Sequence, residues 1–368
     1  MRDQNAAQLL ATVMGWQDEA TVSRFLPKLQ LLADYKYDHY QRFGPGRRFI
    51  ENLALWLNQL AEPDRQAALD LVAERLVYLS DAEFSHLVRT AYPDVIVQER
   101  MRLVAEEHDI PNHRVMKIVR HRRFEELRIK SLYLGLSDGA RTNELRRASG
   151  NAISNEQIWQ AYELGEDKAE EMTDDLKETL GKNGYPVEHA RFNLIWLLDD
   201  FSGSGNTYIR YDASKNVFKG KIRKIYERLH RGDLVDPAHY EVFLLLYVAT
   251  RQAVDHIEYW SERFTSEFGY KPLQIRVLCP IEPDIALTQS VPSQLRSLLA
   301  NTAYYDTRAT DKHIAVGGTT DARLGFAGCA LPVVLSHNTP NNSIYLLWGP
   351  ESFSPFGLFP RMSRHREF

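Results

Sequence analysis

Apolar residues at helical spacing dominate the first third of the chain. In residues 49–60 and 69–79 they recur every three or four positions, which is the period of an amphipathic helix. Gly44–Gly46 and Glu62–Asp64 interrupt the pattern in the way that helix ends do. No strand-like pattern occurs in this part of the sequence. We therefore expect residues 1–125 to form an all-helical domain.

The pattern changes near Lys130, where short apolar runs begin to alternate with helical segments. Four runs have the length and composition of buried strands, namely 131–136, 193–198, 242–249 and 273–279. Helical patterns occupy 155–181, about 217–231, and 251–268. Strands that alternate with helices indicate βαβ units on a parallel sheet. We expect an α/β domain over residues 126–284.

The last part of the chain mixes one helical segment with loops rich in Gly, Pro and Asn. Two apolar runs lie within it, at 330–335 and 343–348. Leu331–Leu335 is too apolar for a surface position, so we expect it to be a buried strand or strand-like segment. We expect residues 285–368 to form a C-terminal lobe that packs on the α/β domain.

Composition and charge are those of an ordinary globular protein, with 44% hydrophobic residues, 26% charged residues and a net charge of −4. This charge provides no overall attraction for a polyanion. The basic stretch 113–130 is a weakly supported candidate for nucleic-acid contact, and a solvated helix face or a surface for a protein partner explains it better.

The chain carries no sign of export or membrane insertion. Cys279 and Cys329 have no metal-binding spacing, and so few thiols are typical of a reducing cytoplasm. Residues 1–20 contain acidic residues and lack the apolar core of a signal peptide. The most apolar run, 242–249, is far shorter than the ~20 residues that span a bilayer. We expect a cytoplasmic protein without membrane partners.

The strongest chemical signal follows the second predicted strand. Asp199 and Asp200 come directly after the apolar run Leu194–Leu198, and Ser202–Thr207 is rich in small and hydroxyl-bearing residues. Ligands of open α/β sheets bind at the C-terminal ends of strands. Carboxylates accept hydrogen bonds from vicinal hydroxyls, and small residues let backbone N–H groups approach a phosphate, especially before a helix. The pattern predicts a ribose-5-phosphate site, whereas a plain strand and helix start would leave the two carboxylates unexplained.

These residues resemble the phosphoribosyl pyrophosphate (PRPP) signature of type I phosphoribosyltransferases. The resemblance implies a parallel-sheet, Rossmann-like core, Mg²⁺ as cofactor, and Asp199 and Asp200 as the catalytic pair that holds the ribose hydroxyls. No metal ligand is assigned directly. The resemblance also implies that the 5′-phosphate is bound by Ser202, Gly203, Ser204, Gly205, Asn206 and Thr207.

A second loop follows the first predicted strand, where the same fold binds pyrophosphate through backbone amides. The corresponding residues are Ser137, Asp138, Gly139, Ala140 and Arg141. Arg141, Arg146 and Arg147 carry charge that would neutralise a pyrophosphate, although they also fit an ordinary helix surface. The family usually has a flexible catalytic loop before the PRPP strand, but here that interval is acidic and helical. No catalytic lysine is evident, so the acceptor stays open.

A narrower resemblance spans residues 130–350. Ser137–Ala140, Asp199–Thr207, Ala330–Asn342 and Leu346–Trp348 together resemble the PRTase-CE family, predicted phosphoribosyltransferases of bacterial conflict and antiphage loci. This resemblance implies a defence effector with a possible protein partner such as a reverse transcriptase. It also implies that the C-terminal lobe contributes possible substrate contacts from His337, Asn338, Asn341 and Asn342. Turn formation is the alternative explanation for these residues.

We therefore expect a phosphoribosyltransferase-like enzyme that binds PRPP and Mg²⁺ and transfers ribose-5-phosphate with release of pyrophosphate. A non-catalytic sensor of PRPP or a nucleotide, acting through the helical domain, is the alternative, and an interaction protein with a degenerate site is a third possibility. Gly181-Lys182 and Gly220-Lys221 are not followed by Ser or Thr, so neither pair belongs to a phosphate-binding P-loop.

Overall fold

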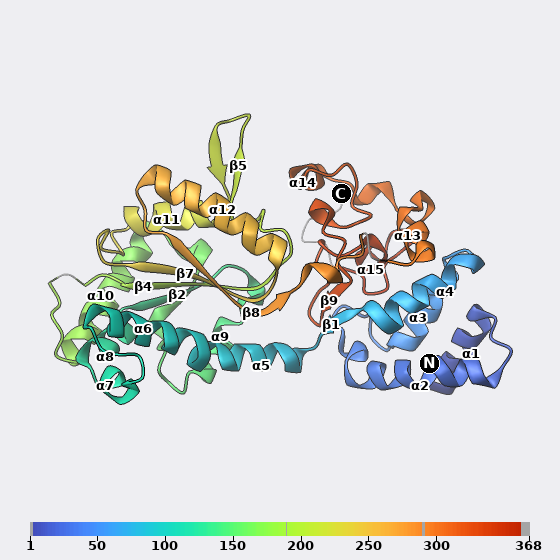
Figure 1. Cartoon of the computed structure of the whole chain (residues 1–368), viewed down its shortest axis with the longest axis horizontal. Coiled ribbons are helices and arrows are strands. Elements are labelled where there is room, and N and C mark those ends of the chain that lie inside the picture. The colour runs from blue at the N-terminus through green and yellow to red at the C-terminus, as the bar shows by residue number, and fades with distance from the viewer. Residues whose placement is uncertain (1–2, 189, 289–290, 362–368) are drawn as a thin grey trace. The chain divides into compact units, whose positions relative to one another are not determined.

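Five parallel strands form the sheet at the centre of residues 85–281, one of the two compact units in the computed structural model (Figure 1). The strand order is β3-β2-β4-β7-β8. Their bounds are Ser131–Gly135 for β2, Ile158–Gln160 for β3, Leu194–Ser202 for β4, Glu241–Thr250 for β7 and Leu273–Ile281 for β8. The structure describes residues 3–188, 190–288 and 291–361. The α/β class with a parallel sheet is confirmed.

Helices cover both faces of this sheet, which is why its central strands are uninterrupted apolar runs. Three helices pack on one face, α10 (Glu166–Lys182), α11 (Lys221–Arg231) and α12 (Arg251–Phe268). On the other face lie α6 (Val97–Glu107), α8 (Arg122–Ile129) and α9 (Thr142–Ala148) (Figure 1). Trp196 of β4 is fully buried and stacks on Phe243 of β7 with ring centroids 4.4 Å apart.

The strands end at different heights along the sheet. Gly135, the last residue of β2, pairs with Leu198, whereas β4 continues beside β7 until Ser202 pairs with Ala249. Asp199 and Asp200 therefore lie in the part of β4 that extends beyond β2. The loop after β2 begins beside them.

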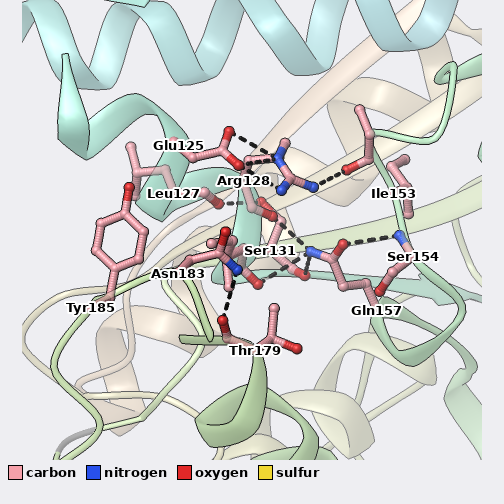
Figure 2. Close-up of polar contacts among 12 residues, drawn as sticks. Glu125, Leu127, Arg128, Ser131, Ile153, Ser154, Gln157, Thr179, Asn183 and Tyr185 are labelled. Carbon is pink, nitrogen blue, oxygen red and sulfur yellow. Dashed lines mark hydrogen bonds and ion pairs between the residues drawn. The ribbon is translucent and has the colours of Figure 1, made fainter. Parts of the chain in front are cut away.

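The edge strand β3 is held to the start of β2 by one amide side chain (Figure 2). Gln157 is buried, and its Nε2 donates to the carbonyl oxygens of Arg128, Ile129 and Ser131 at 2.7, 3.2 and 2.9 Å. Its Oε1 accepts from the backbone N of Ser154 at 3.1 Å. A single side chain thus links the segment before β3 to the last turn of α8 and to the first residue of β2.

Two expectations about this unit are wrong in detail. The segment 155–181 is not helical throughout, because Ile158–Gln160 pairs with β2 and the helix begins at Glu166. The helix expected over 217–231 begins at Lys221. The residues before it form an antiparallel hairpin of β5 (Arg210–Asp212) and β6 (Val217–Lys219), which projects from the sheet domain in Figure 1.

The second compact unit combines both ends of the chain, residues 1–84 and 282–368. Its helices are α1 (Asp3–Met14), α2 (Glu19–Tyr35), α3 (Phe49–Asn58), α4 (Glu62–Asp70), α13 (Ser293–Ala300), α14 (Lys312–Val316) and α15 (Tyr345–Trp348). The helix α5 (Asp81–Ala91) runs from this unit into the other. The apolar run at 343–348 is thus helical at its end.

Pairing between distant segments holds this unit together. A parallel two-stranded sheet joins β1 (Val77–Leu79) to β9 (Val333–Leu335), so the expectation of no strand before residue 125 is wrong and that of a buried strand at 331–335 is confirmed. Trp56 Nε1 donates to the carbonyl of Leu346 at 2.9 Å. The boundaries of the two units differ from those of the three expected segments. Residues 85–125 belong to the same unit as the sheet, and the C-terminal segment belongs to the same unit as the N-terminal helices.

None of the helices that the structure describes has both the length and the apolar character needed to cross a bilayer.

Candidate functional site

The end of β4 carries the two acidic residues that the sequence singles out. Successive side chains of a strand point to opposite faces, so Asp199 and Asp200 have different surroundings. Asp199 is 3% exposed and faces the side of α11, whereas Asp200 is half-buried and faces Gly139. The pair is therefore one buried and one more accessible carboxylate.

Asp199 joins three segments through both of its carboxylate oxygens. Ser137 Oγ donates to Oδ1 at 2.5 Å, and Tyr208 donates its hydroxyl to Oδ2 at 2.8 Å. Lys221 Nζ lies 3.0 Å from the same Oδ2. Burial raises the pKa of Asp199, and the Lys221 ammonium opposes this shift. Burial and the neighbouring carboxylate raise the pKa of Tyr208 well above its usual value, so its hydroxyl acts as a donor.

The loop 137–141 is fixed at several points. Ser137 Oγ accepts from the backbone N of Gly139 at 3.1 Å, and Tyr247 of β7 donates its hydroxyl to the carbonyl of Ala140 at 3.0 Å. A Cβ at Gly139 would lie 2.1 Å from Asp200 Oδ2, so a larger residue there would force the Asp200 side chain to move. The loop is thus built tightly around the two carboxylates.

The three arginines proposed for this loop differ in their surroundings. Arg141, with a left-handed φ of 49°, forms an ion pair with Glu144 at 3.2 Å. Arg146 is half-buried and Arg147 is exposed. Their role in neutralising a pyrophosphate stays a prediction.

The loop after β4 packs against the start of α12. Thr250 Oγ1 donates to the carbonyl of Gly203 at 2.7 Å and accepts from the backbone N of Ala253, which caps the helix. Gly205 has a φ of 77°, and a Cβ there would lie 2.8 Å from the carbonyl oxygen of Ala253. Residues 202–205 are buried, Asn206 is half-buried and Thr207 is exposed.

This loop does not lead directly into a helix. A turn at 206–208 leads into the β5–β6 hairpin instead, and α11 follows only after the hairpin. The loop is tight for two reasons. Gly205 adopts a positive φ, and its carbonyl oxygen accepts a hydrogen bond from the backbone N of Tyr208 at 2.9 Å.

Sequence reasoning missed Gly220-Lys221 as part of this arrangement. The Lys221 backbone N donates to the carbonyl of Thr207 at 3.2 Å, and a Cβ at Gly220 would lie 2.3 Å from the carbonyl oxygen of Tyr208. The Gly-Lys pair can be seen in the sequence, but the sequence indicates only that the pair does not belong to a P-loop. It does not indicate that Lys221 lies beside Asp199. Its distance along the chain from Asp199 is set by the hairpin.

Four polar residues predicted to approach this site belong to the other unit: His337, Asn338, Asn341 and Asn342. Asn342 is buried, and its Nδ2 donates to the carbonyl of Phe326 at 3.3 Å and lies 3.4 Å from the sulfur of Cys329. Asn338 Oδ1 accepts from the backbone N of Thr339 at 3.1 Å. These two amides take part in the loop structure of their own unit, and any contact with a ligand stays a prediction.

Within the described ranges, no three His, Cys, Asp or Glu side chains are grouped so that they could hold a metal ion. Mg²⁺ commonly binds through one or two carboxylates together with substrate phosphates and water. The more accessible carboxylate of Asp200 fits such a shared site.

Comparison with known proteins identifies the family of the chain. The family model of PRTase-CE matches residues 53–361, which cover most of both units. Neither the curated proteins nor the solved structures yield a match. The chain therefore belongs to the PRTase-CE family of phosphoribosyltransferase-like proteins.

Proposed function

We propose that the protein binds PRPP with Mg²⁺ at the C-terminal end of β4 and transfers its ribose-5-phosphate unit to an acceptor. One observation carries the proposal: Asp199 ties the loop 137–141 to the segment that follows β4. Two loops of small residues therefore meet beside Asp200, and PRPP has a phosphate group at each end of a ribose. Family membership supports the same assignment.

Each part of the arrangement suits one part of PRPP. The segment 202–207 wraps the 5′-phosphate with backbone N–H groups and hydroxyls. The loop 137–141 faces the pyrophosphate. Asp200 accepts hydrogen bonds from the ribose hydroxyls. Asp200 would help to hold Mg²⁺ together with the substrate, and the ion would supply charge neutralisation for the leaving group.

The reaction exchanges one bond at C1′ for another. The bond from C1′ to the pyrophosphate oxygen breaks, and its electron pair leaves with pyrophosphate. A lone pair of the acceptor forms the new bond to C1′, and the proton of the acceptor passes to water. Positive charge develops on the ribose ring, and the negative charge of the carboxylates favours it. We place this reaction in the cytoplasm as part of antiphage defence, in line with what the family resemblance implies.

Ligand binding tests the proposal directly. PRPP with Mg²⁺, at a hundred times its Kd, is expected to stabilise the protein by about 2.7 kcal/mol and raise its Tm. Asp200→Asn keeps the size of the side chain and should abolish the rise. Asp174→Asn is the control, since Asp174 is exposed on α10, where it pairs with Lys177. A rise in the Asp200 variant equal to that of the wild type would place the ligand elsewhere.

Turnover is measured separately as pyrophosphate release from PRPP with candidate nucleophiles. Release that depends on Asp200 supports the transferase. Binding without release favours the alternative of a PRPP or nucleotide sensor. Absence of both binding and release would overturn the proposal.

A further inference from the structure

We propose that Lys221 is a positioning residue of this site: it fixes Asp199 between the two loops, so that Asp200 is the carboxylate that meets the sugar. This inference rests on the proposed function. The sequence motif assigns the binding of the ribose hydroxyls to both Asp199 and Asp200, whereas here only Asp200 has this role and Asp199 is structural. The inference also gives a role to Gly220-Lys221, which belongs to no recognised motif.

The surroundings of Asp199 are those of a structural carboxylate. Its side chain is 4% exposed, and hydrogen bonds from Ser137 and Tyr208 occupy different oxygens. The backbone N of Asp200 also lies 3.2 Å from Oδ1. Ribose hydroxyls would have to displace these donors to reach it. Asp200 is the more exposed of the two and lies on the other face of the strand.

A carboxylate buried to this degree needs a compensating charge, because desolvation strongly disfavours an isolated ion. Lys221 supplies that charge, with Nζ 3.0 Å from Oδ2. The ammonium also lies 5.4 Å from the centroid of the Tyr208 ring. Lys221 thus contacts both the acceptor and the neighbouring donor of this cluster.

The backbone around Lys221 explains how the ammonium reaches β4. The chain leaves the site at Tyr208, forms the β5–β6 hairpin, and returns to the same place at Gly220. The φ of 122° at Gly220 and its close approach to Tyr208 both exclude a side chain. Ile222 N then donates to the carbonyl of Tyr208 at 3.0 Å. The base of the hairpin is closed by these contacts, and Lys221 is held beside Asp199.

Loss of the Lys221 charge should therefore act through Asp199 on the loop 137–141. Ser137 Oγ would lose an ionised acceptor, and the loop that faces the pyrophosphate would be less well fixed. The effect should be seen on the loop without ligand and on PRPP affinity with ligand.

The experiment compares PRPP binding with Mg²⁺, by calorimetry, in Lys221→Met, Lys221→Arg and Lys219→Met. Lys219 is the matched control, because it lies two residues before Lys221, at the end of β6, and pairs with Asp212 at 2.6 Å. We expect Lys221→Met to weaken binding by about tenfold to a hundredfold. Lys221→Arg should recover most of the affinity, and Lys219→Met should stay within about twofold of the wild type.

Two further measurements separate positioning from a general loss of stability. Hydrogen exchange without ligand should speed up in the loop 137–141 of Lys221→Met while β8 is unchanged. Asp199→Asn combined with Lys221→Met should bind PRPP no more weakly than Asp199→Asn alone, because Lys221 acts through that carboxylate. If the Met variant does not fold, Lys221→Gln keeps a donor for Asp199 and should show the same loss of affinity.

The outcomes distinguish the two proposals. If wild-type protein binds no PRPP, the proposed function fails, and hydrogen exchange still tests Lys221. If wild type binds and Lys221→Met binds equally well with an unchanged loop, the inference is overturned while the function stands. Equal losses in the Lys221 and Lys219 variants would show a general effect of charge and would also overturn it.

Discussion

Replacing Gly205 by alanine should destabilise the loop after β4 for two separable reasons. The φ of 77° disfavours any residue with a Cβ by about 1–2 kcal/mol. The added Cβ would also lie 2.8 Å from the carbonyl oxygen of Ala253 and 2.9 Å from Cδ2 of His256. Overpacking of this kind costs about 1–3 kcal/mol, and a helix backbone cannot yield cheaply. We expect a total loss of about 2–5 kcal/mol in the free energy of unfolding.

Gly269→Ala is the matched control, because Gly269 has a similar φ of 68° at the other end of α12 and no atom within 4 Å of its added Cβ. It should lose only the backbone part, about 1–2 kcal/mol. Native-state hydrogen exchange at amides of β4 and β7 reports the unfolding of this unit alone. The difference between the two variants, about 1–3 kcal/mol, measures the contact with Ala253.

Equal losses in the two variants would refute the reasoning, since they would mean that the loop does not press against α12. A larger loss in Gly205→Ala should be accompanied by weaker PRPP binding, because the displaced residues are those proposed to wrap the phosphate. Gly269→Ala should leave PRPP binding unchanged.

Three other perturbations test separate parts of the structure. Tyr247→Phe removes the donor to the Ala140 carbonyl and should cost about 1–3 kcal/mol, with faster hydrogen exchange in the loop 137–141; unchanged exchange there would contradict the contact. Gln157→Leu deprives three carbonyls of a donor and should lower the unfolding free energy by more than about 2 kcal/mol, whereas a neutral result would show that other groups satisfy them. Burial raises the pKa of Tyr40 from 10.0 to about 12, so the folded state favours the neutral phenol. The contribution of Tyr40 to the free energy of unfolding is therefore complete below pH 10. It should be lost as the pH rises from 10 to 12, by up to about 2.7 kcal/mol. A denaturation series from pH 9 to 12 against Tyr40→Phe measures this loss, and parallel curves would disprove it.

The central strands could be predicted because each is buried on both faces. Every residue of β2 is buried, and β7 is buried after its first residue, so neither shows polar alternation that could be mistaken for another element. The edge strand β3 could not be predicted, because it has only three residues, all of them half-buried, and follows directly on a 3-10 turn. Strand β1 is equally short, and its partner β9 lies almost at the other end of the chain, so no local pattern marks it.

The candidate site also has a part that the sequence predicts and a part that it does not. Asp199, Asp200 and the loop after them form one contiguous motif, which a sequence displays directly. The difference in burial between the two carboxylates depends on Tyr208 and Lys221, which approach from one face only. Lys221 reaches this place because the β5–β6 hairpin returns the chain to its starting point. No spacing rule links a lysine to a carboxylate across such a hairpin.

The division of one unit between the two ends of the chain has a consequence for synthesis on the ribosome. The Tyr40 hydroxyl bonds to Thr339, 299 positions later, and the fully buried Trp56 donates to Leu346. At about 5–20 residues per second, the roughly 200 residues between the two halves take on the order of 10–40 s to translate. The sheet unit is complete by then and can fold first. The N-terminal helices meanwhile expose apolar faces, and a nascent chain halted before β9 would present them to chaperones or to aggregation.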